Sequence, residues 1–240
     1  QGTTTHIIAG GQYLNSPNRV EISGEGVRAK VVKYIRPLRN LNRERRYMFL
    51  KDLEAASKKR LREAGLSAEV VAQVRNLMLG RWSGFIKQKV KTEGVSPPEH
   101  YLLTDLEEQS LRELIHTRDT LFFPQQKKQR NRQLEESVLI EVTVEPGART
   151  GERELRLQTL TGLTNPMIFQ VGQVPETREL EPNDDAARIA LRNMKGLNNL
   201  PKLRRLLTEK PMELPVTVNG QMMPGDIDRF RFRANKGQNV

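Results

Sequence analysis

The chain has 240 residues, a formal net charge of +11 and no cysteine, which excludes disulfides, thiolate metal sites and a cysteine nucleophile. Only 36% of its residues are hydrophobic and 5% are aromatic, so the composition favours small modules and an exposed segment over one thick core. No apolar run approaches the roughly 20 residues that a membrane-spanning helix needs, so we expect no membrane span.

Strands are predicted on both sides of a helical middle. Residues 1–36 and 135–172 show the alternation of apolar and polar residues that is typical of half-buried β-strands. The alternation is clear in Val27–Val31 and again in Val138–Val144. Neither part has enough strands to bury a sheet alone, so we expect both to contribute to one sandwich.

Residues 37–134 between these parts predict helices. Residues 41–64 are rich in Leu, Ala, Glu, Lys and Arg, and Val70–Met78 place apolar side chains at helical spacing. Thr104 and Glu107 have the spacing of a capping box and predict the start of a third helix. Because loop tips tolerate insertions, we expect this segment to replace a strand-connecting loop of the sandwich.

Three motifs near the C-terminal end follow one another in a familiar order. They are Glu179-Leu-Glu-Pro-Asn-Asp184, Leu214-Pro-Val-Thr-Val-Asn-Gly220 and Pro224-Gly-Asp-Ile-Asp-Arg-Phe-Arg-Phe232. Residues 179–240 thereby resemble the opening of the bacterial pre-peptidase C-terminal domain, with its E-P-N-D entry, a strand leading to N-G and a G-D-x-D strand. That family is a small jelly-roll-like β-sandwich of secreted proteases and other exported proteins. One departure is the longer, basic stretch between the first two motifs.

The first β module carries a second resemblance. Its motifs are Val20-Glu-Ile-Ser-Gly-Glu-Gly-Val27, Pro146-Gly-Ala-Arg-Thr-Gly-Glu-Arg-Glu-Leu155 and Gly162-Leu-Thr-Asn-Pro166. They resemble an immunoglobulin-like domain of the IPT/TIG kind, a family of scaffolds and adhesion-type domains.

Together these patterns predict a mainly β chain with an α-helical insertion. We expect an immunoglobulin-like β-sandwich interrupted by a helical subdomain and followed by a partial jelly-roll-like β-sandwich. The expected parts are the sandwich at 1–36 and 135–172, the insertion at 37–134, a linker at 173–186, and the start of the second sandwich at 187–240. Both ends read as strand sequence cut from a longer chain, so we expect a fragment whose second module is incomplete.

Oxygen-bearing side chains of the C-terminal motifs form a candidate calcium site. Hard oxygen ligands from two segments suit Ca²⁺, which takes 6–8 of them. Some pre-peptidase C-terminal domains bind calcium through an E-x-E-x-N-D linker. The resemblance implies this role for the four ligands from Glu179 to Asp184, and more loosely for Asp226 and Asp228. The alternative is that they cap a helix and form turn hydrogen bonds. The candidate ligands are Glu179, Glu181, Asn183, Asp184, Asp226 and Asp228.

The positive charge is concentrated in the helical segment. Between Arg36 and Leu134 there are 21 basic and 12 acidic residues, a balance of +9, against 19 and 17 in the rest of the chain. Such a segment could dock a protein partner or an anionic polymer. The alternative is an ordinary solvated face, because many of the opposite charges are spaced at i, i+4. No nucleic-acid-binding motif is present, so we do not expect a nucleic-acid partner.

Motifs for catalysis are missing from the sequence. There is no Gly-rich phosphate loop and no G-x-S-x-G elbow, and His6, His100 and His116 lack the spacing of a zinc site. We therefore expect no enzyme activity in this chain.

The expected function is that of a structural or binding, adhesion-type module in a larger exported bacterial protein. Its location would be periplasmic, cell-surface or secreted, with the export signal outside this stretch. Expected partners are other domains of the same polypeptide and an extracellular protein or polysaccharide. One alternative is docking by the basic helical insertion. Another is an accessory region of a secreted protease or hydrolase whose catalytic domain lies elsewhere.

Overall fold

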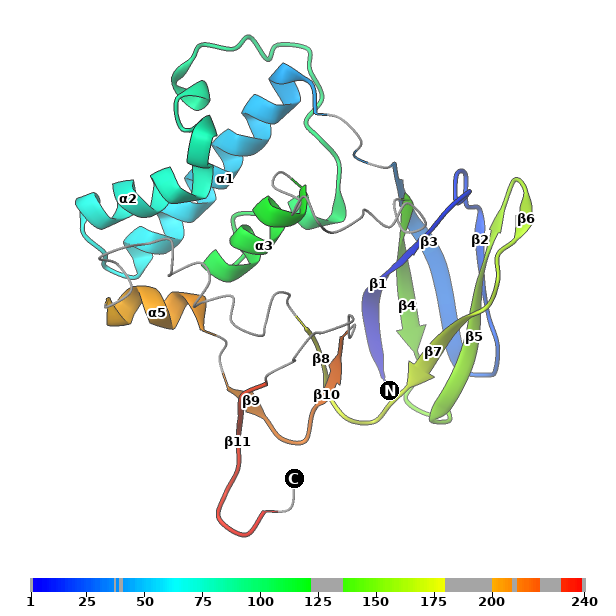
Figure 1. Cartoon of the computed structure of the whole chain (residues 1–240). Coiled ribbons are helices and arrows are strands. Elements are labelled where there is room, and N and C mark those ends of the chain that lie inside the picture. Colours follow the sequence, from blue (N-terminus) through cyan, green and yellow to red (C-terminus); the bar gives the residue numbers. More distant parts are fainter. Residues whose placement is uncertain are drawn as a thin grey trace, which may run out of the picture. The chain divides into compact units, whose positions relative to one another are not determined.

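The computed structural model describes residues 2–36, 38, 41–121, 136–179, 200–208, 211–220 and 230–238. Within them helix and strand occur in similar amounts, so the expectation of a β-rich chain that also carries helices is confirmed in this coarse form (Figure 1). The chain divides into two units. The first, here the β unit, comprises Gln1–Asn40, Glu99–Tyr101 and Gln126–Val174, and the second, the helical unit, comprises Leu41–Pro98, Leu102–Gln125 and Pro175–Val240.

The β unit holds two antiparallel sheets (Figure 1). In the first, β4 (Glu136–Val144) lies between β1 (Thr3–Gly11) and β3 (Val27–Ile35). In the second, β5 (Gly151–Thr159) pairs with three short strands. These are β2 (Arg19–Ile22), β6 (Gly162–Leu163) and β7 (Met167–Val171).

Both sheets contribute to one hydrophobic cluster. Every second residue of β4 from Val138 to Val144 is buried, as the alternation of the sequence predicts. Leu155 and Leu157 of β5 belong to the same cluster. Burial of one face of each sheet fixes the strand registers, because a shift by one residue would expose every apolar side chain of that strand.

The pairing of β3 with β4 places the two ends of the long intervening segment close together. Ile35, the last residue of β3, lies opposite Ser137, one residue after β4 begins. Residues 36–135 therefore leave and rejoin the first sheet at the same end of two neighbouring strands.

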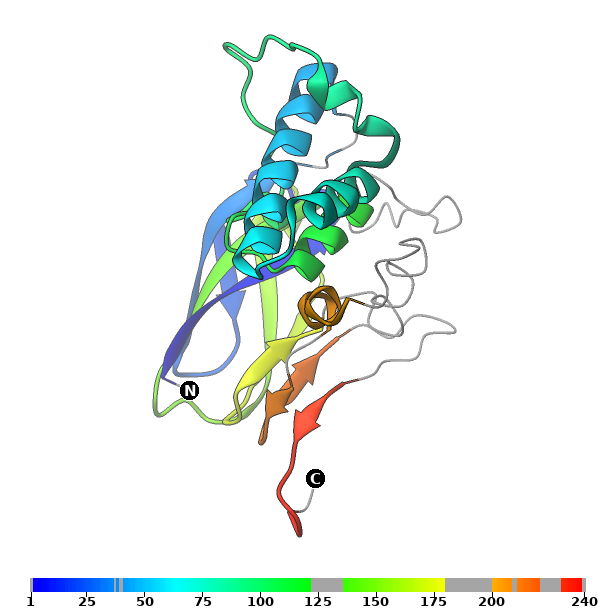
Figure 2. The ribbon, with the colours of Figure 1, turned by 90° about the vertical axis from the view of Figure 1, so that its left-hand side faces the viewer.

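Three helices of the helical unit come from this intervening segment: α1 (Arg43–Glu63), α2 (Ala68–Leu79) and α3 (Leu111–Leu121) (Figure 2). The Asn42 side chain caps α1 by accepting a hydrogen bond from the Arg45 amide at 2.9 Å. Ser67 caps α2 in the same way. Short 3₁₀ turns follow α2 and precede α3; they are η1 (Gly80–Trp82), η2 (Phe85–Lys87) and η3 (Tyr101–Leu103).

The predicted start of the third helix is wrong. Thr104 and Glu107 lie in turns, and Asp105 between them has a φ of 53°, a left-handed conformation that an α-helix does not contain. The capping box is formed instead by Ser110 and Glu113. The Ser110 amide donates to Glu113 Oε2 at 2.6 Å, and the Glu113 amide donates to Ser110 Oγ at 3.2 Å.

A fourth described helix, α5 (Pro201–Leu207), completes the core of the helical unit and lies beside α3 (Figures 1 and 2). Leu203 and Leu207 are buried in the same cluster as Leu53 of α1 and Leu114 of α3. The ammonium group of Lys202 adds a 3.0 Å hydrogen bond to the Gly65 carbonyl oxygen. Residues far apart in the sequence thus build one apolar core.

Two short strand pairs also belong to the helical unit. β8 (Glu176–Arg178) pairs in parallel with β10 (Thr217–Asn219), and β9 (Met212–Glu213) pairs in parallel with β11 (Phe232–Arg233). A jelly-roll-like sandwich in this part of the chain stays a prediction. Among the described helices, none is both long and apolar enough to cross a lipid bilayer.

Candidate functional site

The predicted calcium ligands fall almost entirely outside the described residues. Glu179 is described, whereas Glu181, Asn183, Asp184, Asp226 and Asp228 are not. Within the described ranges, no group of three or more His, Asp and Glu side chains is arranged to hold a metal ion. The calcium site therefore stays a prediction.

Glu179 nevertheless makes a specific contact with the second C-terminal motif. Its amide donates a 2.8 Å hydrogen bond to the Asn219 carbonyl oxygen, which extends the β8–β10 pairing by one step. A Cβ atom on Gly220 would meet the Glu179 carboxylate, so a larger residue there would require the Glu179 side chain to move. The structure thus brings the first residue of the E-x-E-P-N-D motif against the end of the N-G motif.

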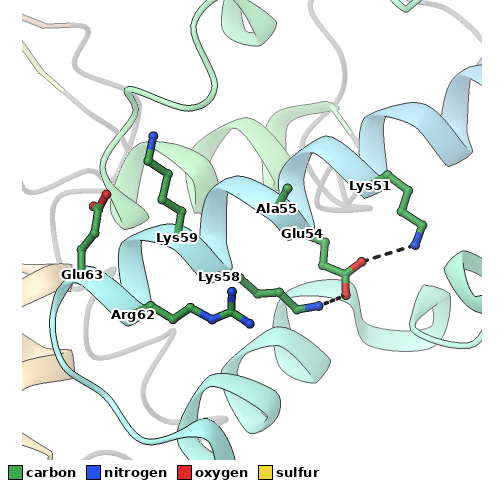
Figure 3. Close-up of a pocket in the computed structure, with 7 residues that line it drawn as sticks. All are labelled: Lys51, Glu54, Ala55, Lys58, Lys59, Arg62 and Glu63. Atoms are coloured by element: carbon green, nitrogen blue, oxygen red, sulfur yellow. Dashed lines mark ion pairs between the residues drawn. The ribbon is translucent and has the colours of Figure 1, made fainter.

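The helical unit contains an ion cluster centred on a buried carboxylate (Figure 3). Glu54 of α1 is 8% exposed, and its Oε1 lies 2.6 Å from both Lys58 Nζ and Arg75 Nε. Lys51 Nζ is 3.9 Å from Oε2. Burial raises the pKa of Glu54, but the hydrogen bonds and charges of Lys58 and Arg75 outweigh burial and hold the pKa below its ordinary value. This cluster ties α1 to α2 through the arginine.

An open hollow of about 580 Å³ runs along this side of α1 (Figure 3). Its lining carries four cations and two carboxylates, and both carboxylates are engaged: Glu54 pairs with two of the lysines, and Glu63 receives a hydrogen bond from Arg60. The hollow is therefore an open groove with a charge balance of +2. Its lining residues are Lys51, Glu54, Ala55, Lys58, Lys59, Arg62 and Glu63.

A second hollow of about 450 Å³ lies between α1 and the turns that follow η3 and is acidic. Partial burial, followed by the negative charge of Glu107, raises the pKa of Asp52. Lys59 offsets part of this charge at 3.7 Å from Glu107. The acidic side chains of the hollow are Asp52, Asp105, Glu107 and Glu108.

Five exposed cations lie in the first turn of α1 and in the segment from Lys87 to Lys91, and we call this group the basic surface: Arg43, Arg45, Lys87, Lys89 and Lys91. Arg43 Nη2 donates to Gln88 Oε1 at 3.0 Å, which places α1 beside the two lysines that flank Gln88. Arg45 Nε donates to the Ser96 carbonyl oxygen at 3.2 Å. None of the five forms an ion pair with a carboxylate of the described residues.

Aromatic packing holds the loop of the basic surface against α1. The Trp82 and Phe85 rings meet edge to face with centroids 5.6 Å apart, and Phe85 meets Tyr47 of α1 at 6.1 Å. The Arg46 guanidinium lies over the Trp82 ring at 4.7 Å from its centroid. These rings are engaged with one another and with cations, so their role is to position the loop.

Basic and acidic residues are concentrated in different parts of residues 41–121. The net charge of the whole helical segment does not reveal this separation. Residues 41–121 carry 15 basic and 12 acidic residues, a balance of only +3. Residues 43–46 and 80–98 together carry seven basic and two acidic residues, whereas residues 102–121 carry two basic and five acidic residues. Two sequence signals could have identified this surface. They are the alternating lysines Lys87, Lys89 and Lys91 and the run Arg43-Glu-Arg-Arg46.

The three histidines occupy unrelated positions. His6 lies on β1, 3.7 Å from Glu141, and His116 lies on α3. Burial lowers the pKa of His100 to about 4, so this side chain is neutral near pH 7. Its ring lies 4.4 Å from the Tyr101 ring.

Comparisons of this chain with protein-family models, with curated proteins and with solved structures found no match. The resemblances to pre-peptidase C-terminal and IPT/TIG domains therefore stay predictions from the sequence.

Proposed function

We propose that this chain is a non-catalytic binding module of a larger exported bacterial protein, in which an immunoglobulin-like β-sandwich presents a helical insertion. The observation that carries the proposal is the register of β3 against β4, with Ile35 opposite Ser137. A segment that leaves and rejoins a sheet at neighbouring positions can be added without changing the strand pairing. Displayed segments on a rigid sheet scaffold are where binding residues concentrate.

The organisation of the helical unit supports a binding role over that of a passive loop. The unit has its own apolar cluster, capped helices and a buried ion cluster around Glu54. Such a unit can hold surface side chains in fixed positions, which lowers the entropy lost on binding. The proposed partners are other domains of the same polypeptide and an extracellular protein or polysaccharide.

A deletion tests the scaffold part of this proposal. A shortened protein would join Arg36 to Glu136 through Asn-Gly, the preferred two-residue hairpin turn, and would end at Val174. We expect it to keep cooperative unfolding by circular dichroism and slow amide exchange at Ile140, the centre of the first sheet. A variant with a ten-residue glycine–serine linker at the same junction controls for turn strain. Loss of structure in both variants would refute the insertion.

Calcium binding belongs to the same proposal. The contact of Glu179 with Gly220 supports it, because it places a predicted ligand beside the second C-terminal motif. Isothermal titration of Ca²⁺ into a protein that holds the whole second module should give a saturating signal. The variant Glu181→Gln/Asp184→Asn should lose that signal. Absence of binding to the unmutated protein would refute the calcium site.

A further inference from the structure

We propose that the basic surface of the helical unit binds an anionic polysaccharide. The inference rests on the proposed binding role and deepens it by naming the residues and the class of partner. It does not depend on the immunoglobulin-like fold or on calcium. The residues that carry it are Arg43, Arg45, Lys87, Lys89 and Lys91.

The first argument is the contrast between these cations and the cations further along α1 and on α2 that form ion pairs. Lys58 and Arg75 are paired with Glu54, Arg60 with Glu63, and Lys59 with Glu107. The cations of the basic surface have no such partner among the described carboxylates, and Gln88 holds Arg43 beside two of them. Like charges brought together without counter-charges repel one another, and an anionic partner relieves that repulsion.

The arrangement of the cations favours an extended polymer over a compact ligand. Lys87 ends the 3₁₀ turn η2, and Gln88 after it has the dihedral angles of polyproline II, −73° and 150°, a conformation that rises by about 3.1 Å per residue. Lys89 and Lys91 follow at alternate positions, so the cations are spaced along the chain. Gln88 and the Ser96 carbonyl oxygen bind Arg43 and Arg45 of α1 beside this segment, so the surface offers several separate contacts.

The surroundings of the cations disfavour the other classes of macromolecule. Within residues 41–47 and 80–98, none of the described large hydrophobic side chains is strongly exposed, whereas a protein interface usually has an apolar core. Trp82 carries the Arg46 guanidinium on its ring, and single-stranded nucleic acid needs open ring faces for base stacking. A polysaccharide that carries repeated carboxylate or sulfate groups needs only the spaced cations.

The test compares two double variants of the full chain that change the net charge equally. Lys87→Gln/Lys89→Gln removes charge from the basic surface, and Arg204→Gln/Arg205→Gln removes it from exposed positions of α5. Binding of a heparin-derived decasaccharide is measured by isothermal titration at several salt concentrations, with neutral dextran as a control. The fluorescence of Trp82, the single tryptophan, checks the fold, and Lys89→Gln/Lys91→Gln serves as a second variant if the first is unfolded.

We expect the lysine variants to bind about tenfold more weakly and the arginine variant to change less than about threefold. We also expect the slope of log K against log salt to fall by about one to two units in the lysine variants alone. Equal losses in both double variants, or no binding by the wild-type chain at low salt, would overturn the proposal. So would binding at least about tenfold tighter to a 20-mer of single-stranded DNA or to phosphatidylserine vesicles, because the partner would then belong to another class. None of these results would refute the proposed scaffold role of the β unit, provided that the protein lacking the helical insertion still folds.

Discussion

Truncation of Leu203 to alanine tests whether α5 is part of the core of the helical unit. The Leu203 side chain is fully buried, with 0% exposure, among leucines of the other helices. Leu203→Ala removes three carbon atoms from this contact at about 0.8 kcal/mol per methylene group, and the cavity left behind adds to the loss. We therefore expect the free energy of unfolding of the helical unit to fall by about 3 kcal/mol.

Trp82 makes this prediction measurable for the helical unit separately. It is the single tryptophan of the chain and packs against the same apolar cluster as Leu203. Urea unfolding followed by its fluorescence should show a midpoint lower by about 2 M, for a denaturant dependence of about 1.5 kcal/mol per M. The control Arg205→Ala, on the exposed side of α5, should stay within about 0.5 kcal/mol of wild type. If Leu203→Ala shifts the midpoint no more than Arg205→Ala does, α5 does not belong to this core.

Three further predictions concern single contacts. Glu54→Gln should destabilise the helical unit by about 1–3 kcal/mol at pH 7, because it leaves Lys58 and Arg75 without their carboxylate. The pKa of Glu54 is lowered in the folded protein, so the stability that its carboxylate contributes is present above the ordinary value of 4.5 and is lost as the pH falls through the folded-state pKa. Urea unfolding at pH 7 and pH 3 measures this difference. If Glu54→Gln lowered the stability equally at both pH values, the ion cluster would be contradicted. The pKa of His100 is lowered from 6.5 to about 4, so the unfolded chain binds more protons in this window and stability should decrease as the pH falls from 6.5 to 4. His100→Gln should remove that decrease in thermal unfolding curves, and an unchanged pH dependence would rule out the buried neutral histidine. Gly220→Ala requires the Glu179 side chain to move and should weaken the β8–β10 pairing, seen as faster amide exchange at Glu179. The control is Gly84→Ala, where an added Cβ meets nothing within 4 Å, and it should leave this amide unchanged.

Local sequence patterns correctly predicted the strands and helices that are determined by neighbouring residues. Alternation in Val138–Val144 identified β4, because one face of that strand is buried along its whole length. The predicted helix at 41–64 matches α1 at Arg43–Glu63 for the same kind of reason: its composition favours helix, and Asn42 caps its first turn. Where two caps compete, however, local spacing cannot decide. Thr104 with Glu107 and Ser110 with Glu113 both fit a capping box, and the left-handed Asp105 excludes the first.

Features that depend on distant residues could not be predicted from the sequence. The partners of Glu54 include Arg75 on another helix, and the hydrogen bond from Arg43 to Gln88 brings the first turn of α1 beside the lysines of a distant segment. The sequence total of +9 for residues 36–134 described a basic insertion of mixed charge. Six of those basic residues lie outside residues 41–121, and the described helices carry a small net charge that is unevenly distributed.

The energetics of loop closure explain why a helical segment of this length is compatible with the pairing of β3 and β4. For a flexible connection, the entropic free energy of closure grows as about (3/2)RT ln n, so each doubling of length costs only about 0.6 kcal/mol. Compared with a two-residue turn, a segment of about 100 residues without structure would weaken the pairing of Ile35 with Ser137 by about 3.5 kcal/mol, which is less than the roughly 5–15 kcal/mol that stabilises a domain. Leu203→Ala should accordingly lower the stability of the helical unit far more than that of the β unit, and amide exchange at Ile140 should change by less than about tenfold. A loss of protection at Ile140 as large as the loss in the helical unit would show that the two units unfold together, and the helical segment would then be an integral part of the fold rather than an insertion.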